Sequence, residues 1–537
     1  MQEGVSRSIR DIVGFRCRNL AESIAAIQYD TRIADNGSLS FTDTWECINR
    51  HEAWLQQAIV DLTIQNKNVQ DVVVAYLSVN SIDMLLSLIS CTNPSLFEQG
   101  NHVAALLNTR WSPEEMAKAL LSQKPQTAAT IVLYGDGLEG VAREVTKKLG
   151  HTSVCLPLPK LSPSFMRHRR LDAKCRASTS TMGLTVKDFE KNADVRDAMI
   201  VFTSGTTGGS KGVRLSHRAI VIQSIAKLSY PCEYSTETNM LASTVSLFHV
   251  GGISSCLAVL LGGGTLVFPD PSESRFTPSG TKVALEYPMC PINTLVVVPA
   301  MLTALLTLLD ATATYPAVRL ILIGGQSVSP PMIQRLVQTF PNARIVQTYA
   351  CTEAASSLTF WHVNASSEEN TIVHSPTSHG DCVGYPPTHV HLRLYRKEGK
   401  VNNIVSLPYQ AGIIATRGPH LMTGYWSRGS LQPSNQHTGW YLTSDWGFID
   451  EHGRLYFCGR AHDSIRSGGE TIMAQEVERV LLQHRDVQDC AVFGKPDDRF
   501  GEVVACAIVI RRNTGNGNNN HLDLDQIKKW CDMHGLV

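Results

Sequence analysis

A run of glycine and hydroxyl side chains that ends in a lysine is the segment of this sequence best suited to chemistry. Residues 203–212 read T-S-G-T-T-G-G-S-K-G, and they follow an apolar stretch from Ala198 to Phe202 that is typical of a buried parallel strand. The glycines let backbone N–H groups approach a ligand closely, the hydroxyls add donors, and Lys211 adds a mobile positive charge. Such a loop suits a polyphosphate. One alternative is that this segment is a flexible linker. The Walker motif of kinases and GTPases does not fit, because Ser210 stands where that motif needs glycine.

A carboxylate follows another predicted strand, Arg344 to Thr348. The sequence there continues as Y-A-C-T-E and ends in Glu353. A lone carboxylate that faces several phosphate oxygens is well suited to sharing a hard cation such as Mg²⁺. The alternative is a helix N-terminus, with Thr352 as its cap and Glu353 meeting the helix dipole.

Three further positions are weaker candidates when each is taken alone. Residues 324–327, G-G-Q-S, stand at the carboxyl end of a predicted strand, Leu320 to Ile323, where open α/β sheets bind ligands. His249 lies between apolar residues and a Gly-Gly pair, where a histidine is more often structural. Asp445 stands in a turn, where an aspartate is usually structural as well.

Taken in order, these motifs resemble the adenylate-forming superfamily of acyl-CoA synthetases, luciferases and peptide-synthetase adenylation domains. The usual loop is T-S-G-T-T-G-x-P-K-G, so Ser210 replaces a proline. Residues 349–353 resemble Y-G-x-T-E with Ala350 in place of the glycine, and residues 439–445 resemble G-W-x-x-T-G-D with Ser444 in place of the glycine. The resemblance covers the chain from about Asp71 onward.

The resemblance implies a role for each candidate. The loop that closes over the β- and γ-phosphates of ATP comprises Thr203, Ser204, Gly205, Thr206, Thr207, Gly208 and Lys211. The residues that contact the rest of the nucleotide are Gly325, Gln326 and Tyr349 at the adenine, Thr352 at the α-phosphate, and Asp445 and Arg460 at the ribose. Glu353 holds Mg²⁺, His249 faces the reacting carboxylate, and Gly468 and Gly469 line the pantetheine channel for coenzyme A. The implied catalytic set is therefore Lys211, His249, Thr352 and Glu353.

The reaction implied by this resemblance is the ligation of a small carboxylic acid to coenzyme A. Attack of the acid on the α-phosphorus of ATP gives an acyl-adenylate, and a thiol then takes the acyl group. Residues 107–112, 353–360 and 381–384 resemble the plant-type ortho-succinylbenzoate–CoA ligases of phylloquinone and menaquinone biosynthesis. A 4-coumarate or fatty acid ligase, and a non-catalytic nucleotide-binding relative, stay open as alternatives.

The elements that must position these residues are predicted by the alternation of apolar runs with helical patterns. Runs at Val72 to Leu77, Ile82 to Ile89 and Thr130 to Tyr134 predict an α/β fold with mostly parallel sheets covered by helices. Ser216 is a plausible N-cap, and a helix that starts near Pro330 is expected to bury Leu336, Val337 and Phe340. The resemblance implies an N-terminal AMP-binding domain over residues 1–461, with a β-rich subdomain at about 380–461, and a small mobile α+β domain over 462–537.

Composition narrows the possible partners. Among 537 residues, 48 Lys and Arg balance 48 Asp and Glu, so charge gives no reason to expect nucleic acid or an anionic membrane. The 14 cysteines show no C-x-x-C spacing and indicate a reducing intracellular compartment without a zinc site. The stretch from Thr294 to Leu309 is too short to span a membrane. No targeting signal is readable in the first twenty residues, and the resemblance implies a plastid or peroxisome.

The end of the chain departs from the family pattern. Family members carry a T-x-x-G-K segment near their C-terminus, whose lysine reaches the carboxylate and α-phosphate during adenylation, whereas this sequence has no lysine after Lys529. The helical pattern at Leu524, Ile527 and Trp530 also lacks the elements that should complete the small domain, so Trp530 is expected to be exposed. We therefore expect a truncated form that binds ATP but adenylates poorly.

Overall fold

The structure is a computed structural model that divides into two compact units, which are described separately. It describes residues 8–20, 23–28, 37–66, 68–97, 100–121, 128–150, 152–161, 186–190, 193–203, 210–269, 276–287, 291–365, 380–396, 404–426, 439–460, 463–467, 470–497, 499–511 and 522–534. The first unit comprises Met1–Asn364, Pro387–Val390 and Gly418–Ser434. The second comprises Ala365–Pro386, His391–Arg417 and Asn435–Val537. The domain boundary at residues 461 and 462 stays a prediction, since both residues lie outside the described ranges.

A seven-stranded sheet carries the predicted phosphate loop. Its strands lie in the order β19-β8-β7-β4-β3-β5-β6. Their bounds are β3 (Asp71–Leu77), β4 (Asn101–Leu106), β5 (Ala128–Tyr134), β6 (Ser153–Pro157), β7 (Asp197–Thr203), β8 (Lys211–Ser216) and β19 (Gly424–Tyr425). β3 to β7 are parallel to one another, β8 is antiparallel to β7, and β19 is antiparallel to β8. The predicted strands at Val72 to Leu77 and Thr130 to Tyr134 are thus confirmed, and they are mostly apolar because both faces are buried.

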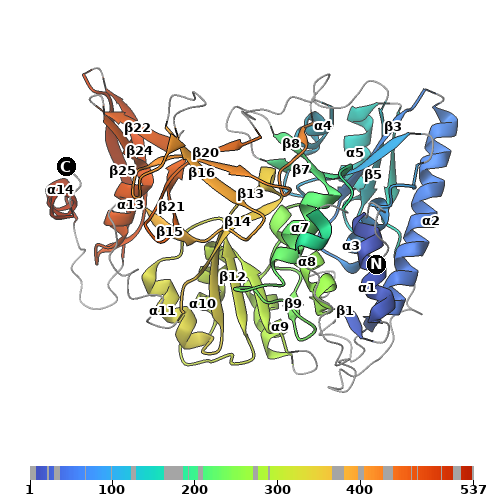
Figure 1. Cartoon of the computed structure of the whole chain (residues 1–537), viewed down its shortest axis with the longest axis horizontal. Coiled ribbons are helices and arrows are strands. Elements are labelled where there is room, and N and C mark those ends of the chain that lie inside the picture. Colours follow the sequence, from blue (N-terminus) through green and yellow to red (C-terminus); the bar gives the residue numbers. More distant parts are fainter. Residues whose placement is uncertain are drawn as a thin grey trace. The chain divides into compact units, whose positions relative to one another are not determined.

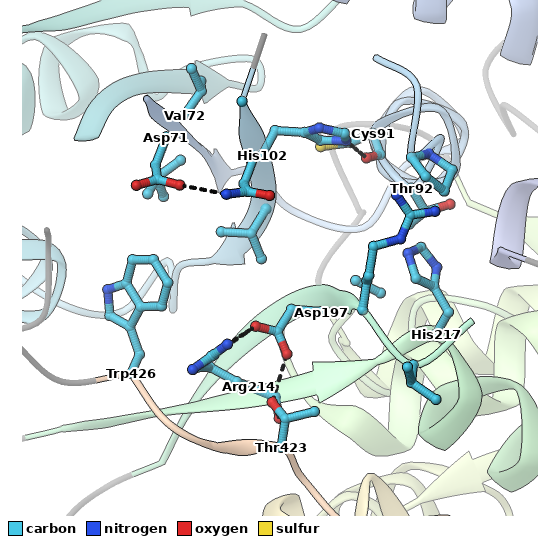
Figure 2. A pocket seen from close by; sticks show the side chains of 18 residues that line it. Asp71, Val72, Cys91, Thr92, His102, Asp197, Arg214, His217, Thr423 and Trp426 are labelled. Atoms are coloured by element: carbon cyan, nitrogen blue, oxygen red, sulfur yellow. Dashed lines mark hydrogen bonds and ion pairs between the residues drawn. The ribbon is translucent and has the colours of Figure 1, made fainter. Parts of the chain in front are cut away.

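A cavity of about 470 Å³ with a mixed polar and apolar lining lies where three of these strands begin (Figure 2). Asp71, His102 and Asp197, from β3, β4 and β7, are among its lining residues. Asp197 accepts hydrogen bonds from Arg214 Nε at 2.6 Å and from Thr423 Oγ1 at 2.6 Å. The cavity is at the amino ends of the parallel strands, so it is distinct from the predicted phosphate loop, which follows the carboxyl end of β7.

A second sheet in the first unit has eight strands. Its strands lie in the order β14-β13-β12-β11-β9-β10-β1-β2. Their bounds are β1 (Ile24–Gln28), β2 (Gly37–Ser40), β9 (Asn239–Leu241), β10 (Thr265–Phe268), β11 (Thr294–Val297), β12 (Leu320–Gly324), β13 (Arg344–Cys351) and β14 (Ser356–His362). The six inner strands are parallel, and the edge strands β2 and β14 are antiparallel. Both sheets confirm the predicted mostly parallel α/β fold.

Helices of the first unit begin at sequence signals that are visible in advance. Their bounds are α1 (Ile9–Asn19), α2 (Phe41–Gln65), α3 (Ile82–Cys91), α4 (Pro113–Leu121), α5 (Glu139–Leu149), α6 (Val186–Glu190), α7 (His217–Ala226), α8 (Val250–Gly262), α9 (Pro278–Glu286), α10 (Pro299–Leu308) and α11 (Pro330–Thr339). Ser216 Oγ accepts from Ala219 N at 3.2 Å, which confirms it as the N-cap of α7. α7 and α8 lie side by side (Figure 1), and α7 contacts β7 and β8 of one sheet and β14 of the other.

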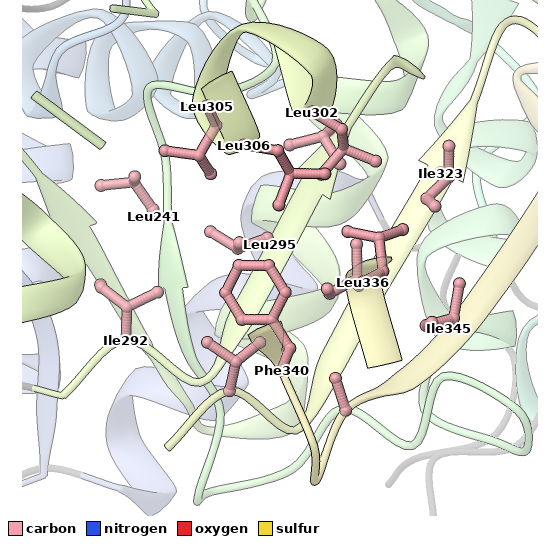
Figure 3. Packing of buried hydrophobic residues seen from close by; sticks show 14 of the residues in the cluster. Leu241, Ile292, Leu295, Leu302, Leu305, Leu306, Ile323, Leu336, Phe340 and Ile345 are labelled. Atoms are coloured by element: carbon pink, nitrogen blue, oxygen red, sulfur yellow. The ribbon is translucent and has the colours of Figure 1, made fainter. Parts of the chain in front are cut away.

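The core beneath α10 and α11 is apolar (Figure 3). Leu302 and Leu306 of α10, Leu336 of α11 and Phe340, which directly follows α11, pack onto the eight-stranded sheet. The prediction that Val337 belongs to this buried face is wrong, because its side chain is 40% exposed. The core-facing stripe of α11 is therefore narrower than the apolar pattern suggested.

The second unit holds two antiparallel sheets. The six-stranded sheet has the order β15-β21-β20-β18-β16-β17, and the four-stranded sheet has the order β23-β22-β25-β24. The bounds are β15 (Asp381–Gly384), β16 (His391–Tyr395), β17 (Ile404–Val405), β18 (Gly412–Arg417), β20 (Tyr441–Ile449), β21 (Leu455–Arg460), β22 (Ser464–Ser467), β23 (Glu470–Met473), β24 (Val487–Asp497) and β25 (Gly501–Ile510). α13 (Ala474–Leu482) packs on β24, and α14 (Leu524–Met533) packs on α13.

The expectation of an exposed Trp530 is wrong. Its side chain is half-buried, its indole N–H donates to the carbonyl of Val480 at 2.9 Å, and its ring lies 4.8 Å from that of His484. This indole therefore fastens α14 to α13. Elsewhere, no helix within the described ranges combines the length and the apolar character needed to cross a membrane.

A buried histidine holds the first helix of the chain. The backbone N–H of Ile9 donates to Nδ1 of His217 at 3.2 Å, so this nitrogen must be unprotonated. His217 is 3% exposed, and burial lowers its pKa to about 4, against a smaller opposing effect of Asp194. The unfolded chain titrates this group near 6.5, so between about pH 6.5 and 4 the unfolded state binds a proton that the folded state excludes. The free energy of unfolding therefore falls as pH decreases through this range.

We predict that His217→Asn flattens this pH dependence. The amide oxygen can still accept from Ile9 but does not titrate, so the variant should lose a contribution of about 3 kcal/mol to the pH-dependent change. The measurement is the free energy of unfolding in urea between pH 4 and 7, with the exposed His391→Asn as the control substitution. Equal slopes for His217→Asn and the wild type would contradict the assignment.

Candidate functional site

The predicted phosphate loop lies in a hairpin between β7 and β8. Thr203, the last residue of β7, pairs in register with Lys211, the first residue of β8. Thr203 is half-buried and Lys211 is exposed at the mouth of the hairpin. The other predicted loop residues fall within residues 204–209, outside the described ranges; they are Ser204, Gly205, Thr206, Thr207 and Gly208. The structure therefore fixes the two ends of the loop at the carboxyl end of a parallel strand.

A short strand, β19, braces this hairpin. Its residues pair antiparallel with β8, with Tyr425 opposite Val213. The N–H of Thr423 donates to the Arg214 carbonyl at 3.0 Å, and the N–H of Trp426 donates to the Gly212 carbonyl at 2.7 Å. The segment that carries β19 is thus bonded to the strand that positions Lys211.

The same segment reaches Glu353. The phenol O–H of Tyr425 donates to Oε1 of Glu353 at 2.8 Å, and the N–H of Met422 donates to the Glu353 carbonyl at 2.8 Å. Lys211 Nζ lies 5.5 Å from the centroid of the Tyr425 ring, within the range of a cation–π contact. Tyr425 therefore lies between the predicted loop cation and the predicted metal carboxylate. Sequence reasoning gave Tyr425 no role, because nothing in its local sequence indicates a contact with Glu353.

Glu353 lies in a three-residue 3₁₀ turn, Thr352–Ala354, that leads directly into β14. The alternative that Thr352 caps a helix is wrong, because no α-helix follows. Ala355 has φ +57°, a left-handed conformation that costs a non-glycine residue about 1 kcal/mol. Glu353 is half-buried. The chain thus holds this carboxylate at a sharp reversal between two strands.

The residues predicted to border the adenine lie at adjacent strand ends. Gly324, the last residue of β12, pairs with Thr348, and Tyr349 is the next residue of β13. Gly325 has φ +86°, which permits the chain to leave the strand in a conformation that favours glycine. Gln326 is exposed, whereas Tyr349 is only 8% exposed.

His249 stands at the N-cap of α8 but does not cap the helix with its side chain. Its ring packs on Phe248, with 4.6 Å between centroids. Although the side chain is exposed by area, nearby protein still desolvates the ring, and this effect together with the positive charge of Arg110 lowers the pKa of His249. A neutral His249 side chain that does not cap α8 is consistent with its predicted position near a reacting carboxylate.

The predicted ribose contacts lie in the second unit. Asp445 on β20 is opposite Arg460 on β21, and Arg460 Nε lies 3.8 Å from Asp445 Oδ1. Ser444 has φ +67°, at the position where the resembled motif has glycine. Gly468 and Gly469 lie outside the described ranges.

The surroundings of Glu353 can be compared with the ligands that a magnesium ion needs. Within the described ranges, no group of three or more His, Cys, Asp or Glu side chains could hold a metal alone. Tyr425 occupies one oxygen of Glu353, and the other has no partner among the described residues. One free carboxylate oxygen fits Mg²⁺, which typically binds through one or two carboxylates plus substrate phosphates.

A phosphate-loop hairpin, a lysine and a carboxylate at the carboxyl ends of parallel strands are typical of nucleotide-binding α/β enzymes. Comparison with known proteins defines this class further. Residues 17–426 match the family model of the AMP-binding enzymes, and residues 476–534 match that of the AMP-binding enzyme C-terminal domain. The chain belongs to the AMP-binding enzyme family.

Individual relatives support the same conclusion. The chain is 32% identical over 428 residues to the chloroplastic/peroxisomal 2-succinylbenzoate–CoA ligase of Arabidopsis thaliana, covering 75% of this chain and 71% of the relative. It is 31% identical over 389 residues to the oxalate–CoA ligase of Arabidopsis thaliana, covering 69% of each. The structure of o-succinylbenzoate CoA synthetase from Bacillus subtilis, in complex with its acyl-adenylate intermediate, has a TM-score of 0.71 at 22% identity. That comparison covers 97% of this chain and 91% of the other. It shows that the fold is shared.

We predict that Ser444→Gly stabilises the protein. Serine pays a backbone cost of roughly 1–2 kcal/mol in the left-handed region, and glycine avoids it at a smaller cost in unfolded-state entropy. The expected gain is about 0.5–1 kcal/mol in the free energy of unfolding. The measurement is urea unfolding, with the exposed Ser406→Gly as a matched substitution in a segment of no assigned role. A loss of stability in Ser444→Gly would contradict the strained conformation.

Proposed function

We propose that this chain is an ATP-dependent acid–CoA ligase whose acid is 2-succinylbenzoate. The observation that carries the proposal is the Lys211–Tyr425–Glu353 row, which brings a loop cation and a carboxylate together in a member of the AMP-binding enzyme family. The ligase of Arabidopsis acts on 2-succinylbenzoate and the other Arabidopsis relative acts on oxalate, so both take acids with two carboxylates. The resemblance of residues 107–112, 353–360 and 381–384 to 2-succinylbenzoate–CoA ligases favours 2-succinylbenzoate.

The first step joins the acid to AMP. A carboxylate oxygen attacks the α-phosphorus of ATP, a P–O bond forms, and the bond to pyrophosphate breaks. Negative charge accumulates on the departing pyrophosphate, which Lys211 and the backbone N–H groups of residues 203–208 would stabilise. Mg²⁺, held by Glu353, would add a fixed positive charge at the same phosphates.

The second step transfers the acyl group to coenzyme A. The thiol sulfur attacks the acyl carbon, a C–S bond forms, the C–O bond to AMP breaks, and the thiol proton is released. In this proposal Gly468 and Gly469 line the pantetheine channel, and Asp445 and Arg460 hold the ribose. His249 faces the acyl carbon. The chloroplastic/peroxisomal location of the Arabidopsis ligase supports a plastid or peroxisomal location for this chain.

We predict that Lys211→Ala and Glu353→Ala each slow adenylate formation about a hundredfold, since one preorganised charge contact at a transition state is worth on the order of 3 kcal/mol. Both side chains are at strand ends and outside the core, so unfolding should be little affected. The measurement is acid-dependent ATP–pyrophosphate exchange. Exposed residues of α5, as Lys147→Ala and Glu144→Ala, are the matched controls. Unchanged exchange in either site variant would remove that residue from the site.

We predict that 2-succinylbenzoate is activated in preference to 4-coumarate and medium-chain fatty acids. The measurement is AMP release with ATP, Mg²⁺ and coenzyme A across this set of acids. A second assay supplies synthetic acyl-AMP with coenzyme A, so that the thioester step is observed alone. Faster turnover of a fatty acid would overturn the substrate while leaving the ligase, and failure of both assays with every acid would overturn the enzyme.

A further inference from the structure

A lysine lies in the interior of the first unit without an acidic partner. Lys227 follows the last residue of α7, and its side chain is 1% exposed. Burial lowers its pKa to about 8, so the ammonium still carries its proton near neutral pH. No carboxylate within the described ranges lies at ion-pair distance from it. A buried charge without a counter-charge is costly, so its presence requires a reason.

Two buried hydroxyls surround this lysine. Lys227 Nζ donates to Ser254 Oγ at 2.7 Å and to Ser356 Oγ at 3.2 Å, and the two hydroxyl oxygens are 2.9 Å apart. Ser254 Oγ also donates to the carbonyl of Val250 at 2.7 Å. Because the one proton of Ser254 is used on Val250, Ser254 Oγ is left to accept the hydroxyl proton of Ser356. The third ammonium proton of Lys227 has no acceptor in the part of the chain that the structure describes. A positive charge with a spare donor is the complement of a carboxylate.

The cluster lies between the two segments predicted to hold the reacting groups. Ser356 opens β14 directly after the Glu353 turn, and Ser254 lies on α8, which begins at His249. Gln223 on α7 donates to the carbonyl of Ala354 at 2.8 Å and to that of Ser357 at 2.9 Å, which fixes α7 against the same turn.

Between His249 and Ser254, α8 has a position without a side chain. Gly251 lies one turn before Ser254, and a Cβ there would meet only Val245, at 3.8 Å. From His249 to Ser254 the helix axis rises by roughly 7.5 Å. That span is comparable to the separation of the two carboxylates in extended 2-succinylbenzoate, whereas the directly bonded carboxylates of oxalate are much closer together.

We propose that Lys227, Ser254 and Ser356 recognise the second, non-reacting carboxylate of a dicarboxylic acid substrate. This inference rests on the proposed function, because it assumes that an acid lies along α8 with its other carboxylate at the adenylation site. The buried ammonium then has its counter-ion only in the complex. Lys227 is in this account a specificity-determining residue, and acids with a single carboxylate leave it unpaired.

The test compares one dicarboxylate with analogues that lack either carboxylate. The acids are 2-succinylbenzoate, 4-oxo-4-phenylbutanoate, which lacks the ring carboxylate, and 2-butanoylbenzoate, which lacks the chain carboxylate. The readout is kcat/KM for acid-dependent AMP formation by wild type, Lys227→Met, Ser356→Ala, and Ser224→Ala as a control for a buried polar change on α7. Met preserves most of the side-chain volume and removes the charge.

We expect the kcat/KM of the wild type to be about a hundredfold higher for 2-succinylbenzoate than for the more active of the two analogues. Lys227→Met should lose this preference, because its kcat/KM falls for 2-succinylbenzoate and not for the analogues. Ser356→Ala should lose about tenfold in the same direction, since it removes one donor and keeps the charge. Ser224→Ala should keep the preference. Equal losses on all three acids, or an unchanged preference in both site variants, would overturn the role of Lys227. A wild type that activates other acids but not 2-succinylbenzoate would instead overturn the substrate, and this inference with it.

Discussion

The candidate site depends on one constraint, the pairing of the two-residue edge strand β19 with β8 in the seven-stranded sheet. β19 pairs with β8, and the residues around it bond to Gly212, Arg214 and Glu353. Those partners come from two segments more than a hundred positions apart, and the strand holds the loop hairpin and the Glu353 turn to the same short segment. The Tyr425 side chain connects the two segments, since its ring contacts Lys211 and its hydroxyl donates to Glu353.

Several residues near the site have locally unfavourable conformations or environments. Ala355 and Ser444 both take left-handed backbone conformations next to predicted site residues. Lys227 keeps a charge in the interior, beside two hydroxyls. Local strain and buried polar groups persist where surrounding structure enforces them, and they cluster at functional sites. Ala355 and Ser444 lie within two residues of Glu353 and Asp445, and Lys227 reaches Ser356, three residues after Glu353.

The sequence predicted the parts of this structure that follow from local pattern. Apolar runs located β3, β5, β7 and β12, Ser216 predicted the start of α7, and the motifs placed Lys211, Tyr349 and Glu353 at strand ends. Contacts between distant segments were not readable. Periodicity put Val337 inside although neighbouring elements leave it exposed, and nothing local indicated that Val480 would accept the Trp530 indole proton. The roles of Tyr425 and Lys227 were missed for the same reason, because each depends on partners from other elements.

The central claim is that Tyr425 and Glu353 act as a unit. The most direct test is a double-mutant cycle of Tyr425→Phe and Glu353→Gln, measured by acid-dependent ATP–pyrophosphate exchange. The hydrogen bond to a charged group predicts a coupling energy of about 1–2 kcal/mol, so that Tyr425→Phe costs roughly tenfold in the wild type and little in Glu353→Gln. Strictly additive effects, with the same loss from Tyr425→Phe in both backgrounds, would contradict the account.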